Sequence, residues 1–293
     1  MKWSTVRMGK GKHLPDIPSV SIVFGNYMAK LRTTTVSSWP ALCAQVEKAR
    51  GYLDLEGTEE MWFRGLSSRH HALRPSLFRC FKKETPDIGK IRDLENDLFF
   101  EFQAKARFSE GVALSDWDVL FLMQHYRAPT RLLDWTEVLH VAVYFAIAYR
   151  KLGESEMARL YLMNPYLWNK KLGYGRDLYS PRNFSWDPRE EDYYDYGEIL
   201  VDRDYIDWRY PCALYPPQRD ARLSAQKGYF TIHGNDLRAL EEIAPGLLFA
   251  VDLDKAAMDD CRRQLAFSGI DEFSLFPDLE GLSRKLRIKY ECG

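Results

Sequence analysis

The segment from Trp62 to Arg79 carries the residue types that bind anions. Arg64 stands where a short expected strand ends, and Gly65 follows it. A glycine lets the backbone approach a ligand closely, and a guanidinium offers two parallel donors to a phosphate or carboxylate. The further basic residues of this segment are Arg69, His70, His71, Arg74 and Arg79. The alternative is a solvated basic turn with one structural ion pair, because exposed pairs of this kind are common and weak.

A second group of polar side chains lies between two apolar segments, in the stretch 124–136. Its members are Gln124, His125, Thr130, Arg131, Asp134 and Thr136. Buried polar groups need partners, and Arg131 with Asp134 is the pair we expect, as a staple that holds a helix–loop–helix corner. The other interpretation is that the loop lines a cleft and that a helix over 137–150 presents its N-terminus to an anion.

A third candidate is Gln226, in the stretch 222–233. The alternation of residues and the break at Gly228 predict a strand there, and a glutamine beside such a break can face a ligand. The alternative is an exposed glutamine on a strand. The chain lacks the P-loop, the dinucleotide-binding glycine pattern, the zinc-protease motif and the nucleophile elbow. Adjacent histidines on a strand point in different directions, so we expect no metal site.

The elements that must position these residues are helices and short strands without a regular alternation. Helical spacing predicts helices over 37–50, 91–108, from Ser115 to Tyr126, 137–151, 255–269 and 278–287. Ser37 or Ser38 can cap the first, and Ser115 with Asp118 forms a capping box for the third. Strands are expected at 20–24, 61–65, 157–165, 222–234 and 246–254, with an extended loop at 128–136 and a long irregular stretch at 173–197. The pattern predicts an α+β fold: a single compact domain over 37–293, with short mixed strands flanked by helices, after an N-terminal extension at 1–36.

The composition fits a globular chain that is large enough to bury a core without disulfides. The 41 basic and 42 acidic residues give a formal net charge of −1, which disfavours a nucleic-acid binder held by bulk charge. The five cysteines are odd in number and lack metal-ligand spacing. The sequence shows no secretory signal and no apolar run of membrane-spanning length, so a cytoplasmic protein without a membrane partner is expected.

Together these segments resemble the FRG domain, a mostly bacterial family named for its Phe-Arg-Gly signature. The resemblance is carried by Trp62-Phe63-Arg64-Gly65, by Leu73-x-Pro75-Ser76-Leu77-x-Arg79, by the block from Gln124 to Thr136, and by Ala142-x-Tyr144-Phe145-Ala146. Two later stretches are also similar, Arg222 to Phe230 and Phe276 to Leu279, so the resemblance spans about 37–290. Arg127-Ala128 departs from the usual glycine and apolar residue, which adds a charge to the loop.

The order of these motifs is similar to that of the ADP-ribosyltransferases. This resemblance implies a fold like that of those enzymes and a chemistry that cleaves NAD. In those enzymes an aromatic-Arg-Gly strand holds the NAD phosphate and ribose, and a later strand carries a catalytic glutamate. Gln226 stands where that glutamate would be expected, and Asp134 is the residue that could supply the negative charge instead. The resemblance implies catalytic roles for Arg64, Gln226 and Asp134. It implies NAD contacts from Arg64, Gly65, His125, Thr130, Arg131 and Thr136.

Three functions remain open at this point. The first is an NAD-consuming enzyme, an ADP-ribosyltransferase or an NAD glycohydrolase, that acts as a bacterial toxin or anti-phage effector on a protein or nucleic-acid acceptor. The second is a non-enzymatic module that binds a nucleotide or a nucleic acid, which the missing glutamate favours. The third is a nuclease or phosphotransferase that uses the arginines and histidines of 64–79 together with His125.

Overall fold

The computed structural model describes residues 30–81, 87–110, 114–148, 150, 156–180, 196–201, 209–216 and 221–290. The strand expected at 20–24 and residues 181–195 of the expected irregular stretch lie outside these ranges.

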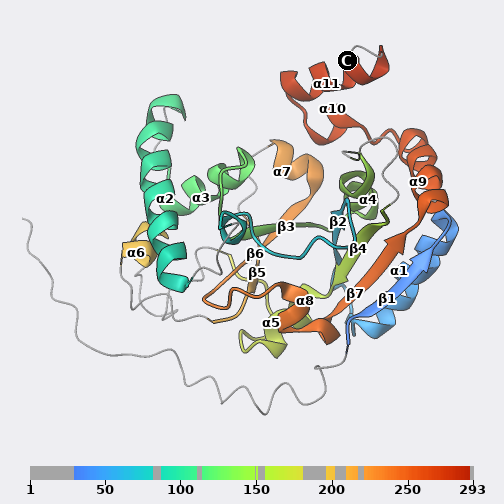
Figure 1. Cartoon of the computed structure of the whole chain (residues 1–293), viewed down its shortest axis with the longest axis horizontal. Helices are drawn as coiled ribbons and strands as arrows, with labels where there is room; N and C mark the ends of the chain where they lie inside the picture. Colours follow the sequence, from blue (N-terminus) through green and yellow to red (C-terminus); the bar gives the residue numbers. More distant parts are fainter. Residues whose placement is uncertain are drawn as a thin grey trace, which may run out of the picture.

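One seven-stranded mixed sheet forms the centre of the described structure, in the order β1-β7-β4-β2-β3-β6-β5 (Figure 1). β1 runs parallel to β7, and every other neighbouring pair of strands is antiparallel. The strands are β1 Arg32–Val36, β2 Trp62–Leu66, β3 Leu132–Thr136, β4 Ala158–Met163, β5 Cys212–Leu214, β6 Gly228–Ile232 and β7 Leu248–Leu253. The expected α+β class is confirmed.

Most of the predicted helices are present, and the described residues form further short helices as well. They are α1 Trp39–Tyr52, α2 Ile88–Glu110, α3 Asp116–His125, α4 Leu139–Ile147, α5 Pro165–Lys171, α6 Tyr196–Val201, α7 Ala221–Gln226, α8 Leu240–Ile243, α9 Lys255–Phe267, α10 Glu272–Leu275 and α11 Leu279–Lys289, with short 3-10 turns η2 Leu77–Arg79 and η4 Pro245–Leu247. Ser38 caps α1, and Ser115 with Asp118 forms the predicted capping box of α3. These side chains satisfy amide groups that a helix N-terminus leaves unpaired.

Among the differences from the sequence prediction, two concern the strands β1 and β3. β1 lies within the last five residues of the expected 1–36 extension and pairs with β7, so the folded part begins before Ser37. β3 lies in the segment expected to be an extended loop, where it pairs with β6 through five residues. Arg131 and Asp134 interrupt the apolar pattern there, and the partners that stabilise the strand are distant in sequence.

The sheet is covered unequally on its two faces. On one face, α1, α4 and α9 enclose a cluster that includes Phe63, while α2, α3 and α6 enclose another at the β5–β6 end (Figure 1). Side chains alternate along a strand, so Leu132, Asp134 and Thr136 share this face. Leu132 lies in the second cluster, yet the Asp134 side chain is 57% exposed. Asp134 therefore lies on a part of this face that the helices leave open. The opposite face packs in a third cluster around Trp62, Trp135 and Trp168.

Gly65 fixes the distance between β2 and the helix that covers it. A Cβ atom at Gly65 would lie 1.9 Å from the carbonyl oxygen of Ala142 and 2.8 Å from the backbone nitrogen of Ala146, both in α4. Main-chain atoms of a packed helix cannot move aside as a side-chain end can. Gly65 therefore serves close packing of α4 on the strand, and this side of β2 is closed to a ligand.

We expect Gly65→Ala to lower the free energy of unfolding by about 2–3 kcal/mol, because the added methyl group overpacks the contact with α4. The matched control is Gly51→Ala in α1, where an added Cβ meets nothing within 4 Å and helix propensity favours alanine. Denaturant unfolding of both variants checks this. Equal stabilities would contradict the packing role.

Candidate functional site

β2 and β3 are joined at one end and part at the other. The register pairs Phe63 with Thr136 and no further residues of these two strands, although both are described over their whole length. On their other sides, β2 pairs with β4 and β3 pairs with β6 through five residues each. The sheet therefore opens beyond the Phe63–Thr136 pair, between Arg64 on one strand and Asp134 on the other.

Arg64 reaches across this opening. Its Nη1 donates to the backbone oxygen of Asp134 at 2.5 Å and lies 3.4 Å from Oδ2 of the same residue. By alternation, Arg64 lies on the face of Trp62 while the Asp134 side chain lies on the opposite face. The contact is possible because the strands part here.

The Arg64 guanidinium lies in an environment that disfavours its charge. Burial is the largest cause and lowers its pKa, the charge of Arg79 lowers it further, and Asp134 opposes both by its charge and its hydrogen bond. The Nε atom of Arg64 is buried and has no hydrogen-bond partner. Unpaired buried donors are costly, so an anion that accepted from Nε would stabilise this arrangement.

Asp134 is held in place by its neighbours while its carboxylate stays open to solvent. Nε2 of Gln124 donates to Oδ2 of Asp134 at 2.9 Å, and Thr130 in turn donates to Oε1 of Gln124. The Thr130 amide donates to the hydroxyl of Ser76 at 3.1 Å. Arg64 and Gln124 thus orient one carboxylate, which can face a developing positive charge on a bound molecule.

The predicted Arg131–Asp134 pair is wrong. Arg131 is fully buried and forms a fork with Glu95 of α2: Nε donates to Oε1 at 2.7 Å, and Nη2 donates to Oε2. Burial opposes this charge, but the Glu95 carboxylate raises the pKa of Arg131 above its ordinary value. Residues three apart on an extended chain point to opposite faces, which separates Arg131 from Asp134.

Glu95 is a residue that sequence reasoning missed, and a signal for it existed. It lies between Ile91 and Phe99 at intervals of four residues, on the apolar side of the predicted helix. All three are buried. A lone carboxylate on an apolar helix face indicates a buried cationic partner.

Gln226 is not on the predicted strand. It ends helix α7, and its Nε2 donates to the backbone oxygen of Leu275 at 3.0 Å. Lys227 follows with a positive φ of 43°, and the strand begins only at Gly228. The run Ala-Arg-Leu-Ser-Ala-Gln consists mostly of strong helix formers, and this preference overrides the short alternation.

The remaining predicted contact residues have structural partners. Thr136 donates to the Gln226 carbonyl at 2.7 Å and accepts from the Val138 amide, and Thr130 is bonded as described above. His125 lies in the last turn of α3, where its carbonyl accepts from Arg222 and its ring contacts Tyr126. The structure thus brings Arg64 and Asp134 together and gives the other predicted residues supporting contacts.

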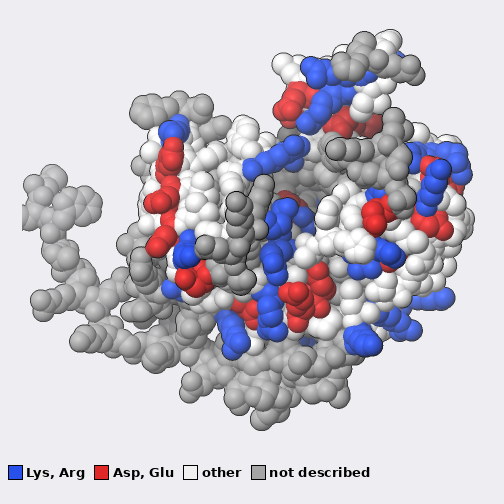
Figure 2. Space-filling view, in the orientation of Figure 1, with Lys and Arg blue, Asp and Glu red and all other residues white. Residues whose placement is uncertain are grey.

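Arg79 of the basic segment lies near Arg64, and Arg74 lies near His233, whose pKa the charges of Arg64 and Arg74 both lower. Arg79 lowers the pKa of Arg64, and Arg74 has a buried Nε without a hydrogen-bond partner. Figure 2 shows Lys and Arg side chains in a strip down the middle of the face in view. In the same orientation, Figure 1 shows the segment between β2 and α2 crossing in front of the sheet. Arg69 and His70 contact other groups. Nη1 of Arg69 lies 3.9 Å from the sulfur of Met157, and His70 pairs with Glu156.

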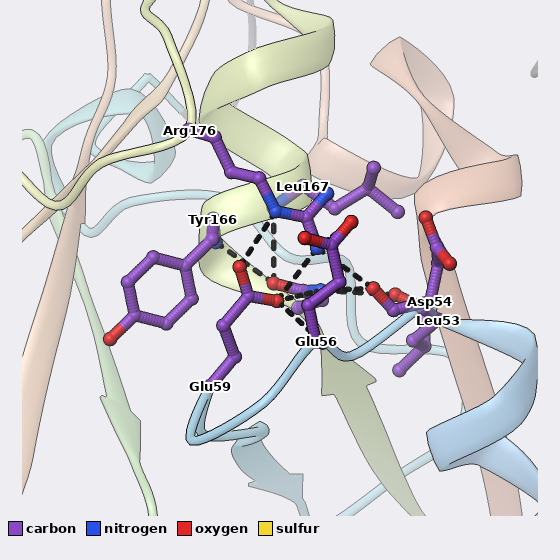
Figure 3. Close-up of polar contacts among 8 residues, drawn as sticks. Leu53, Asp54, Glu56, Glu59, Tyr166, Leu167 and Arg176 are labelled. Atoms are coloured by element: carbon purple, nitrogen blue, oxygen red, sulfur yellow. Dashed lines mark hydrogen bonds and ion pairs between the residues drawn. The ribbon is translucent and has the colours of Figure 1, made fainter.

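A polar cluster beside α5 is an example of charged and polar groups that pair with one another and stabilise the fold. Arg176 donates to both carboxylate oxygens of Glu59 at 2.7 Å, and the Asn164 amide donates to Glu59 and to the carbonyls of Leu53 and Asp54 (Figure 3). These groups satisfy one another, and they tie the segment after α1 to α5. By contrast, the buried Nε atoms of Arg64 and Arg74 have no hydrogen-bond partner.

Within the described residues, no three His, Cys, Asp or Glu side chains are grouped closely enough to hold a metal ion. Cys43, Cys80, Cys212 and Cys261, which lie in this part of the chain, are free thiols. No helix in the described ranges is long and apolar enough to cross a membrane.

Comparison with known proteins gives one family match, over part of the chain. Residues 59–154 match the family model of the FRG domain. The matched span contains β2, β3, Arg64 and Asp134, and it is shorter than the 37–290 expected from the motifs. β6 and α7, with Gln226, follow it. No curated protein and no solved structure matches the chain.

We expect Glu95→Gln to lower the free energy of unfolding by about 3–5 kcal/mol, because it leaves the buried Arg131 charge without its counter-ion. Asp134→Asn should change it by less than about 1 kcal/mol, because the side chain is largely exposed and the amide oxygen still accepts hydrogen bonds. Thermal and urea unfolding of both variants test this. A larger loss in Asp134→Asn than in Glu95→Gln would show that the wrong pair had been assigned.

Proposed function

The chain contains an FRG domain, and from the geometry of that domain we propose that it consumes NAD as an ADP-ribosyltransferase or an NAD glycohydrolase. The observation that carries the proposal is the opening between β2 and β3, where a poorly solvated Arg64 lies beside the oriented carboxylate of Asp134. NAD carries a group for each of these residues: a diphosphate anion for Arg64 and a cationic nicotinamide–ribose centre for Asp134.

The chemistry needs few groups from the protein. The bond between the ribose C1′ and the nicotinamide nitrogen breaks, and its electron pair neutralises the pyridinium ring. Positive charge develops on the ribose, as in glycoside cleavage, and a water or an acceptor nucleophile then bonds to C1′ and loses a proton. A fixed carboxylate stabilises that charge.

Asp134 fits this role better than Gln226. Its Oδ2 is held by Gln124 and Arg64, and more than half of the side chain is exposed, so it is both oriented and accessible. A glutamine amide can donate and accept hydrogen bonds but carries no charge, and the Gln226 amide donates to Leu275. Arg64 binds the anionic part of the ligand in this account, and Asp134 faces the ribose.

One observation favours a second candidate function, binding of a nucleotide without turnover. The Asp134 carboxylate lies 3.4 Å from the Arg64 guanidinium, which reduces the negative charge that it offers to a ribose cation. A protein of this kind would hold the nucleotide as a sensor. Toxin or anti-phage activity would follow from turnover and not from binding alone.

The test is release of nicotinamide from NAD, measured by mass spectrometry with and without cell lysate as a source of acceptor. We expect release by the wild-type protein, and losses on the order of 10²-fold in Arg64→Ala and in Asp134→Asn, because each removes an interaction with the charged transition state. The control is Arg262→Ala on α9, which removes an exposed guanidinium of the same charge.

Release that persists in folded Arg64→Ala would contradict the proposal. Tight NAD binding that depends on Arg64, with no release by the wild-type protein, would establish the second candidate instead.

A further inference from the structure

His233 is a fully buried residue whose two ring nitrogens have no hydrogen-bond partner. It follows β6 directly, is 0% exposed, and neither Nδ1 nor Nε2 has a hydrogen bond. Its backbone is fixed, because its amide donates to the Arg131 carbonyl at 3.0 Å and its carbonyl accepts from Nη1 of Arg131 at 2.8 Å. The ring lies edge-on to Phe78 at 5.7 Å. Buried polar groups are normally satisfied, so these two nitrogens require an explanation.

The surroundings of the His233 ring are positively charged. Burial is the main cause that lowers its pKa to about 3, and the charges of Arg131, Arg64 and Arg74 lower it further, while Asp236 opposes them. The imidazole is therefore neutral at physiological pH and carries one N–H donor and one acceptor nitrogen. It can bind an anionic oxygen without adding a charge to a crowded cationic region.

Arg74 and Arg79 bring further donors to the same region. The Nε of Arg74 is buried and unpartnered, while its Nη2 lies 3.5 Å from Glu242. Arg79 ends the η2 turn and is exposed, and its charge acts on Arg64. Arg131 is excluded as a ligand contact because Glu95 and the His233 carbonyl occupy its guanidinium.

We propose that His233, Arg74 and Arg79 extend the Arg64 site into a subsite for the diphosphate of a nucleotide. The inference rests on the proposed function for its location and goes beyond it by assigning these three residues. Tetrahedral phosphates present oxygens in several directions and spread two or more negative charges, which suits several guanidinium forks and one neutral N–H donor. A single planar carboxylate would leave most of these donors unused.

Isothermal titration with ADP, inorganic pyrophosphate and adenosine tests the subsite. We expect ADP and pyrophosphate to bind in competition and adenosine not to bind. Arg74→Ala and Arg79→Ala should each weaken ADP binding by about tenfold or more, because each removes a charge-assisted hydrogen bond. Arg69→Ala is the matched control, since it removes an equal charge from the same segment. An equal loss in that variant, or no ADP binding at all, would overturn the proposal.

NMR of protein labelled with ¹⁵N-histidine tests His233 directly. The chain has six histidines, so the His233 ring signals can be assigned with His233→Gln as the reference. ADP should shift one ring N–H to the frequency of a hydrogen-bonded proton. His233→Gln, which keeps a donor, should retain more ADP affinity than His233→Phe. Ring signals that do not respond to saturating ADP would exclude His233 from the subsite.

These results separate the subsite from the proposed enzyme. ADP binding that depends on Arg74, Arg79 and His233, without nicotinamide release, supports the subsite and refutes the NAD-consuming activity. Nicotinamide release that depends on Arg64, with ADP binding unchanged in the three variants, supports the enzyme and refutes the subsite.

Discussion

The buried ion pair between Arg131 and Glu95 connects the elements on which the site depends. Arg131 lies directly before β3, Glu95 lies on α2, and the Tyr196 hydroxyl at the start of α6 donates to Glu95 at 2.5 Å. The same guanidinium donates to the carbonyl of His233 beyond β6. One pair of charges thus fixes the start of β3, the end of β6 and two helices. Desolvation of both charges is compensated only while all of these contacts are present, so the local geometry is strongly defined.

That constraint explains how the protein maintains a site with unpaired donors. β3 is fixed by Arg131 at one end and by its pairing with Phe63 at the other, while Gly65 holds β2 against α4. The two strands can therefore part between these points without loss of the sheet. Arg64 occupies the gap among other cations, with Asp134 as its counter-charge. Such unsatisfied groups are costly to the folded state, and functional sites are where this cost is usually found.

The sequence predicted those features that depend on local signals. Helix caps at Ser38 and Ser115 and the short strand before Gly65 depend on neighbouring residues, and the structure confirms them. The candidate arginine and aspartate were also visible, because Arg64 and Asp134 stand in unusual polar contexts. The pairing of strands and charges was not predictable in the same way. Glu95 reaches Arg131 across 36 positions, and Arg64 reaches Asp134 across 70. Sequence spacing suggested a local Arg131–Asp134 pair, but the two side chains point to opposite faces because this segment is extended and not a loop.

His233 and Gln226 show two different limits of the sequence prediction. The motif order predicts a catalytic role for Gln226, where a glutamate is expected, whereas in the structure Gln226 ends a helix and its side chain donates to the Leu275 carbonyl. For His233 the sequence predicts no role, because no local pattern relates the end of β6 to Arg64. The place of His233 follows from β2, β3 and β6 being neighbours in the sheet although they are distant in the chain, whereas that of Gln226 follows from the helix preference of the residues before it.

The central claim is that the β2–β3 opening binds the anionic part of a nucleotide through Arg64. A crystal structure of the protein with ADP-ribose tests it most directly. We predict a phosphate oxygen within about 3 Å of Nε of Arg64, a hydrogen-bond distance to the atom that lacks a partner without ligand. A nucleotide bound elsewhere, with Arg64 still in contact with Asp134 alone, would contradict the account.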